Sequence, residues 1–259
     1  MALKNVKRLS LLMAIGAVCA WSIDIPRIGF ARDAQGRIVS IDGIAGNFIS
    51  GQVLADDAVG FSWNGVFGIR KTDSTVEWWD NAGTRLAVID APAGDVVIGF
   101  GGQSALIYSK SAQIFNELKM GQWSMQQIPV SLSSTDEEVL ALTGRQDTVD
   151  IAVRRGGGLF VVTFDRTTGN RVAEAALSRS ATRALFLPDG AMAGIAGSTI
   201  WIARADGSEW SVDTGVTLTG LTWMGKEWIQ ASAEDRLFGL RIRAGADPAL
   251  YLIPEAVRE

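Results

Sequence analysis

The stretch from Ala58 to Pro92, AVGFSWNGVFGIRKTDSTVEWWDNAGTRLAVIDAP, decides the fold class of this chain. Its runs of Val, Ile, Phe, Trp and Thr are separated by Asn64-Gly65, by Thr72-Asp73-Ser74 and by Asn81-Ala82-Gly83. β-Branched and aromatic runs bounded by Asn, Asp and Gly are typical of antiparallel strands joined by tight turns. The stretch therefore predicts a unit of three or four short strands.

The same unit recurs along the chain. The clearest pair is Ala58–Gly65 and Leu218–Gly225, which share Gly, Trp and Gly at equal offsets. The predicted first hairpin turns are about 40 residues apart on average, and they fall at Gly65, Gly102, Gln146, Gly190 and Gly225. The turn between the third and fourth strands keeps Asp or Asn for capping and Gly for positive φ. It occurs as Asp80–Gly83, Asp165–Gly169 and Arg204–Gly207.

The segment ahead of Ala58 is irregular. Ile28–Asp42 reads as the last two strands of a unit, with the same Asp-x-x-Gly turn at Asp33–Gly36, and Phe48–Leu54 adds a third strand. The chain from Trp21 onward has room for about six units of this period, five of them complete. It contains no low-complexity stretch or linker, so we expect residues 21–259 to form one all-β domain.

Residues 1–20 resemble a secretory signal peptide and are set apart from the fold. Lys4, Lys7 and Arg8 precede the apolar run Leu9–Ala20, which is shorter than the roughly 20 residues that span a bilayer. An uncleaved anchor and a lipidated Cys19 are the two alternatives. The pattern predicts an exported protein, periplasmic or extracellular in a bacterium, with no transmembrane span in the mature chain.

Composition excludes several function classes. The chain has no His and a single Cys, Cys19, so Ser-His-Asp and Cys-His catalysis and thiolate or imidazole zinc sites are unavailable after cleavage. Removing residues 1–20 leaves 21 basic and 28 acidic residues. An acidic chain without a dense Lys/Arg run is not expected to bind nucleic acid. No disulfide can form in the mature chain.

Four-stranded units of about 40 residues, repeated four to eight times, resemble the β-propeller family. The resemblance covers Ile28–Pro254 and rests on generic features, because neither a WD40 Trp-Asp ending nor a kelch Gly-Gly pair recurs. The expected fold is a propeller of about six four-stranded blades. Five full blades with an N-terminal closing segment are the alternative within this fold, and a barrel or sandwich is the competing fold.

Asp165–Asn170, DRTTGN, resembles the Asp-x-x-Thr-Gly turn of quinoprotein-like propellers. That family includes quinone-dependent dehydrogenases and a non-catalytic lipoprotein of outer-membrane protein assembly. The other units lack the Thr and the Trp that usually follows, so the resemblance is partial. The front segment is also similar to uncharacterised secreted bacterial propellers, a comparison that implies no activity.

Four tryptophans are candidate contact residues for a partner or a sugar. Trp63 and Trp223 occupy equivalent repeat positions, where a Trp either stacks on a ligand or packs between blades. Trp78 and Trp79 are adjacent in one strand and therefore point to opposite faces. We expect one of this pair to be buried and the other to be the more exposed, as an interface anchor.

The second loops of three successive units carry cations, and these predict a weak anion or carboxylate site at one mouth of the channel. The residues are Arg70, Lys71, Lys110, Arg154 and Arg155. Solvated loop tips are the alternative interpretation.

The candidate carboxylate sets Asp56-Asp57, Asp136-Glu137-Glu138 and Glu234-Asp235 read as parts of polar turns, and no Asp-x-Asp-x-Asp calcium loop is present. We therefore expect no catalytic residue, no metal site and no cofactor. The predicted function is a secreted, non-enzymatic scaffold or protein-interaction module, with a protein partner and a place in a cell-envelope assembly. A small anionic or sugar ligand is an additional expectation. The alternative is a carbohydrate-active or quinone-dependent enzyme.

Overall fold

The computed structural model describes residues 25–243 and 245–254, and every regular element in these ranges is a β-strand. The predicted signal peptide, including Cys19, lies outside the described residues. The described residues contain no helix that is long and apolar enough to cross a membrane.

The strands form successive antiparallel groups in chain order. The first group has three strands, β1 (Arg27–Arg32), β2 (Ile38–Ile44) and β3 (Asn47–Ala55). The second has four, β4 (Gly60–Trp63), β5 (Gly68–Lys71), β6 (Thr75–Trp79) and β7 (Arg85–Asp90). An eight-stranded sheet follows, made of β8 (Val96–Gly101), β9 (Ser104–Ser109), β10 (Ile114–Lys119), β11 (Met125–Ile128), β12 (Glu138–Gly144), β13 (Thr148–Arg155), β14 (Gly158–Asp165) and β15 (Arg171–Leu177).

Two further four-stranded sheets complete the chain. They are β16 (Arg183–Phe186), β17 (Met192–Ala196), β18 (Thr199–Ala203) and β19 (Glu209–Asp213), and then β20 (Gly220–Gly225), β21 (Trp228–Ser232), β22 (Leu237–Arg241) and β23 (Ala249–Ile253). The eight-stranded sheet consists of two four-stranded halves, because β8 and β12 are joined only through the parallel pair Thr143 and Phe100.

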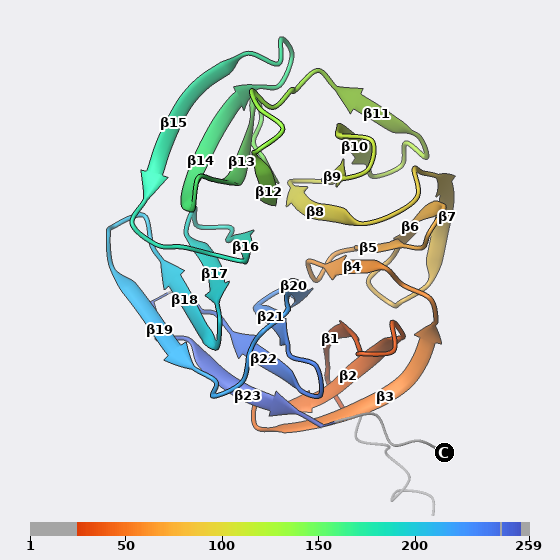
Figure 1. Ribbon diagram of the computed structural model, residues 1–259. Coiled ribbons are helices and arrows are strands. Elements are labelled where there is room, and N and C mark those ends of the chain that lie inside the picture. Colours follow the sequence, from red (N-terminus) through yellow and green to blue (C-terminus); the bar gives the residue numbers. More distant parts are fainter. Residues whose placement is uncertain (1–24, 244, 255–259) are drawn as a thin grey trace, which may run out of the picture.

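The groups stand around a central axis, with β4, β8, β12, β16 and β20 innermost (Figure 1). Buried apolar side chains fill the spaces between neighbouring groups rather than one central core. Ile69 and Trp78 pack with Ile107 of the next group, and Ile195 and Ile200 pack with Ile229. The predicted β-propeller is therefore confirmed, and the single closed barrel and the sandwich are not observed.

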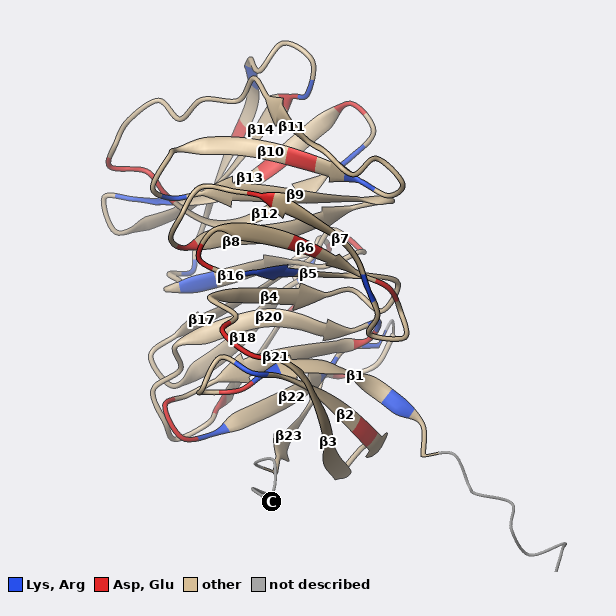
Figure 2. Cartoon of the chain, turned by 90° about the vertical axis from the view of Figure 1, so that its right-hand side faces the viewer, with Lys and Arg blue, Asp and Glu red and all other residues tan. Residues whose placement is uncertain are grey.

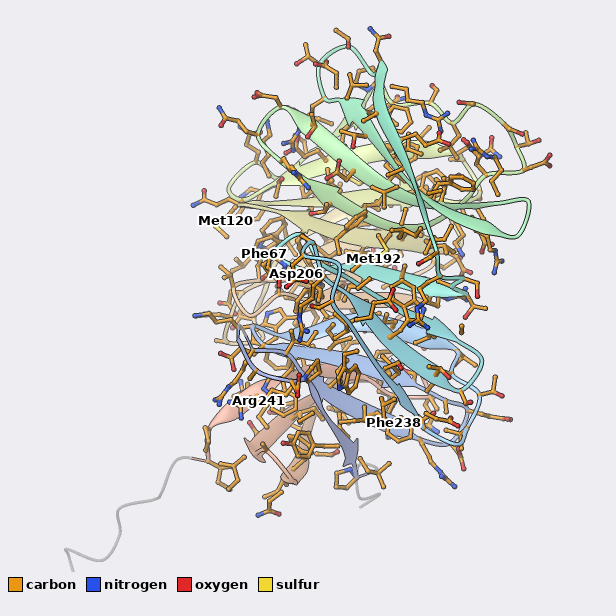
Figure 3. All side chains as sticks on the ribbon, turned by 90° about the vertical axis from the view of Figure 1, so that its left-hand side faces the viewer. Phe67, Met120, Met192, Asp206, Phe238 and Arg241 are labelled. Atoms are coloured by element: carbon orange, nitrogen blue, oxygen red, sulfur yellow. The ribbon has the colours of Figure 1, made fainter. Side chains whose placement is uncertain are left out.

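The two ends of the axis carry different connections. The end called here the hairpin face holds the turns between the first and second and between the third and fourth strands of each four-stranded group. The opposite end, the connection face, holds the remaining turns and the links between groups. Phe67, Met120, Asp206 and Arg241 mark the hairpin face on the left of Figure 3.

The three-stranded group lacks an innermost strand. The β1–β2 turn lies on the connection face, where the Gly36 carbonyl accepts from Ala58 N–H ahead of β4 at 2.9 Å. β1, β2 and β3 therefore run in the directions of second, third and fourth strands, and β1 lies farther from the axis than β4 and β20 (Figure 1). Equating the Asp33–Gly36 turn with the third-to-fourth-strand turn was wrong, because it joins the equivalents of strands two and three.

β4 and β20 close the gap that the missing strand would fill. A Cβ atom on Gly65 would lie 2.6 Å from the backbone nitrogen of Lys226. A Cβ on Gly29 of β1 would overlap the Met224 carbonyl oxygen, and one on Gly225 would overlap the Ile28 carbonyl oxygen. The backbones are too close for any larger residue, and no additional strand fits between them.

Candidate functional site

Each face of the propeller has a cavity at the end of the central channel. The hairpin-face cavity has a volume of about 600 Å³ and the connection-face cavity one of about 560 Å³. Both volumes lie within the range of small-molecule pockets, which is roughly 300–1,000 Å³. Neither cavity was evident from the sequence, because its lining comes from turns and strand ends of five or more groups.

The hairpin-face cavity is lined by both apolar and polar residues. The apolar lining includes Phe100, Leu142, Phe186, Leu187, Pro188 and Trp223. Asn64, Arg145, Asp189 and Lys226 contribute polar atoms to the lining. Protein–protein contacts likewise combine apolar and polar residues.

A series of aromatic rings extends from this cavity toward the rim of the hairpin face. Phe100 lies edge-on to Phe67 at 5.3 Å, and Phe67 is stacked on Trp78 at 4.1 Å. Trp78 lies edge-on to Trp123 at 6.3 Å between ring centroids. Trp123 itself is 48% exposed in the turn between β10 and β11. Phe67 and Trp78 are buried and Phe100 is partly buried, so Trp123 is a surface side chain packed against enclosed aromatic rings.

The four predicted tryptophans are all buried, Trp63, Trp78, Trp79 and Trp223. The expectation that one of Trp78 and Trp79 would be exposed was wrong. A sheet of a propeller has a neighbour on both faces, so both sides of β6 are covered, and the Trp79 Nε1–H donates to Glu77 at 3.0 Å. Trp223 lines the hairpin-face cavity, whereas Trp63 packs edge-on against Phe30 at 4.6 Å.

The five predicted cations do not form one anion site. Arg70 is buried and donates to Glu77 at 2.8 Å, and Lys71 is fully buried with its Nζ 2.6 Å from the Asp73 carbonyl oxygen. Burial lowers the pKa of Lys71, with the charge of Asp73 acting in the opposite direction. Both side chains therefore bind partners inside the protein and are not available to an external anion.

The two arginines at the end of β13 are also ion-paired. Arg154 pairs with Glu138, and Arg155 bridges Glu137 at 2.8 Å and Glu174 at 2.6 Å. The hydrogen bond to Glu174 is the main cause of the raised pKa of Arg155. Of the five predicted cations, Lys110 is the one that lines the connection-face cavity.

Buried carboxylates occur inside the strands, which the sequence did not lead us to expect. Glu77, Glu117 and Asp150 are each less than 10% exposed. Each is within 4.0 Å of at least one arginine, and Figure 2 shows acidic and basic residues interspersed on one side of the propeller. These carboxylates are committed to internal ion pairs and offer no free pair for acid–base chemistry. The described residues contain no cluster of three or more metal-ligating side chains.

The sequence matches no protein-family model, and it matches no curated protein. Similarity to known proteins is found among solved structures, 327 chains of which match.

PorZ of Porphyromonas gingivalis, a bacterial surface component of the type-IX secretion system, is similar over 91% of this chain, with 13% identity and a TM-score of 0.50. The match covers 38% of PorZ, so this chain spans much less than two thirds of it. A protein of unknown function from Bacteroides caccae matches over 90% of this chain and 100% of its own length, with 11% identity and a TM-score of 0.50. At these identities the similarity shows the fold alone, which is that of a β-propeller.

Proposed function

We propose that this chain is an exported, non-enzymatic protein-interaction module that receives an apolar segment of a partner protein on its hairpin face. The observation that carries the proposal is the apolar cavity, which continues through buried aromatic rings to the exposed Trp123. Trp is enriched among the residues that dominate binding energy at interfaces.

The large apolar side chains exposed on this face include Val66, Met120 and Trp123. Val66 lines the cavity and is 59% exposed, while Met120 is 40% exposed in the same turn as Trp123. A partner that buries these side chains gains the hydrophobic contribution of roughly 25 cal/mol per Å² of apolar surface. An extended or looped segment with one or two apolar side chains fits a cavity of this size.

The rest of the molecule supports a scaffold rather than a catalyst. The strand carboxylates are ion-paired, and the chain has no His. The proposed export to the periplasm or the exterior rests on the resemblance of residues 1–20 to a signal peptide. We further propose that the exported protein belongs to an envelope assembly. PorZ, which shares the fold, is described as a surface component of a secretion system.

The proposal is tested by cross-linking and co-purification from the native envelope fraction with wild-type protein and the Trp123→Ser variant. A partner that wild type retains should be lost at least tenfold in W123S. The matched control is Leu86→Ser, since Leu86 is also 48% exposed but lies on the outer strand β7. Equal retention by wild type and W123S, or equal loss in L86S, would contradict a role for the hairpin face.

A further inference from the structure

Half of the cations that lack an ion pair in the described part of this acidic protein line one cavity. Most described Lys and Arg side chains have a carboxylate within 4.0 Å. Within the described ranges the exceptions are Arg32, Lys71, Lys110, Arg183, Arg204 and Lys226. Three of these, Arg32, Lys110 and Arg183, come from different groups and line the connection-face cavity.

Arg32 is held in place more firmly than the other two. Its backbone N–H donates to Gln230 Oε1 at 2.9 Å, and its carbonyl accepts from Gln230 Nε2 at 2.6 Å. Its Nε donates to the Ala58 carbonyl oxygen at 2.5 Å. Neither Nη group has a hydrogen-bond partner among residues 25–243 and 245–254. The Arg32 guanidinium is thus anchored through Nε, while both Nη groups are free to donate to a ligand.

The missing inner strand explains why Arg32 reaches the channel. In the other groups an innermost strand separates the second strand from the axis, whereas β1 has none. The end of β1 and its turn therefore line the cavity directly. Burial lowers the pKa of Arg32, while the charges of Asp33 and Asp95 act in the opposite direction.

The carboxylates around the cavity do not neutralise this fork. Asp33 accepts from Arg37 Nε at 2.7 Å and from two backbone N–H groups of its own turn, so its oxygens are occupied. Asp95 and Glu234 line the cavity without an ion-pair partner among the described residues. Because neither carboxylate forms an ion pair with Arg32, the Arg32 guanidinium remains available to a ligand. The charges of Asp95 and Glu234 would repel a second negative charge on that ligand.

One residue beside the cavity, Ser62, has a buried hydroxyl without a partner among the described residues. Ser62 is 2% exposed, lines the same cavity, and its Oγ has no hydrogen-bond partner in the described part of the chain. Its Oγ is itself enclosed, so the proposed site rests on Arg32 and not on this hydroxyl. The cavity lining combines polar residues with aliphatic ones, for example Ile98, Leu140 and Leu221.

We propose that the connection-face cavity binds a small monocarboxylate with an apolar body, whose carboxylate is held by the free Nη groups of Arg32. Arg presents paired N–H donors that match the two oxygens of a carboxylate. Lys110 and Arg183 add positive charge to the cavity lining, and the aliphatic side chains contact the apolar part of the ligand. This site is separate from the hairpin face and does not depend on the function proposed for that face.

The test is isothermal titration calorimetry of the purified protein with hexanoate, adipate and 1-hexanol. These three compounds share a six-carbon chain. Hexanoate should bind saturably, and both adipate and 1-hexanol should bind at least tenfold more weakly. Arg32→Gln should weaken hexanoate binding at least tenfold, whereas the control Arg204→Gln, at an unpaired arginine on the hairpin face, should not. Absence of saturable hexanoate binding, or equal binding by R32Q, overturns the proposal.

A measurement on the wild-type protein locates the site without a mutation. Amide NMR shifts of Gly60 and Gly220, which line the connection-face cavity, should move on addition of hexanoate. Those of Gly102 and Gly190, at the opposite cavity, should stay in place. The reverse pattern would overturn the assignment even if R32Q failed to fold.

Discussion

The side-chain amide of Gln230 on β21 takes the place of a strand partner for Arg32 on β1, 198 residues away in sequence. It accepts from the Arg32 N–H at 2.9 Å and donates to the Arg32 carbonyl at 2.6 Å. β1 has no inner neighbour that could satisfy these groups. One buried side chain therefore joins the N-terminal group to the last one and helps to close the ring.

Replacing Gln230 should weaken this closure. In Gln230→Leu the Arg32 N–H and carbonyl lose their partners, and an unsatisfied buried polar group costs about 1–3 kcal/mol. We expect the free energy of unfolding in urea to fall by about 2 kcal/mol or more. Gln127→Leu on the exposed part of β11 is the matched control and should change it little. Equal effects of the two substitutions would show that Gln230 has no special role.

The glycine contacts across the seam should be equally sensitive. Gly29→Ala places a methyl group on the Met224 carbonyl oxygen and should cost about 1–3 kcal/mol through overpacking. Gly220→Ala is the control, because its Cβ would meet the Ser232 side chain at 3.4 Å without a backbone clash. Urea denaturation of both variants gives the two free energies of unfolding to be compared. A Gly29→Ala protein as stable as Gly220→Ala would mean that β1 is free to move away from β20.

Arg166 gives the DRTTGN turn a structural role. It pairs with the buried Glu117 of the preceding group and donates to the Arg145 carbonyl at 2.8 Å. Arg166→Met leaves Glu117 with only Lys119 at 3.7 Å, and breaking a buried pair costs about 3–5 kcal/mol.

The double variant Arg166→Met/Glu117→Leu should be more stable than R166M alone, because it leaves no buried charge unpaired. Arg179→Met, in the exposed pair with Glu209, should change thermal stability little. If R166M and R179M melted at the same temperature, the turn would not contribute to packing between groups.

Stability should fall in acid. Hydrogen bonds from Thr168 hold the pKa of Asp165 below its usual value, and a hydrogen bond from Arg179 lowers the pKa of Glu209. A carboxyl with a lowered folded-state pKa stabilises the fold above its unfolded pKa of about 4, and this stabilisation is lost as the pH falls through the folded pKa.

We therefore expect the free energy of unfolding to change little between pH 7 and about 5.5 and to decrease below about pH 4. Asp165→Asn should reduce the acid-dependent part, and Thr168→Val should reduce it by less, because only the hydroxyl donor is lost. Unfolding curves at pH 3 and pH 7 measure the acid-dependent loss of stability in each variant. An unchanged acid dependence in D165N would rule out this carboxyl as a contributor.

Local sequence signals located most of the strands and turns. Gly102 and Gly190 mark first hairpin turns as predicted, and both have positive φ in the structure. The candidate site was less accessible to sequence reasoning. Lys110 and Trp223 do line the two cavities, but Arg32 and Trp123 carried no signal beyond an ordinary strand end and an ordinary turn.

The sequence by itself determined the all-β class, the repeat of about 40 residues and the turn positions, because these depend on residues a few places apart. Tertiary structure alone decided that the N-terminal group lacks its inner strand, that Trp79 is buried and that Arg70 is paired while Arg32 is not. The physical reason is that burial and charge pairing depend on side chains from neighbouring groups and from distant parts of the same group. Their positions follow from closure of the ring, as the contact between Gln230 and Arg32 shows.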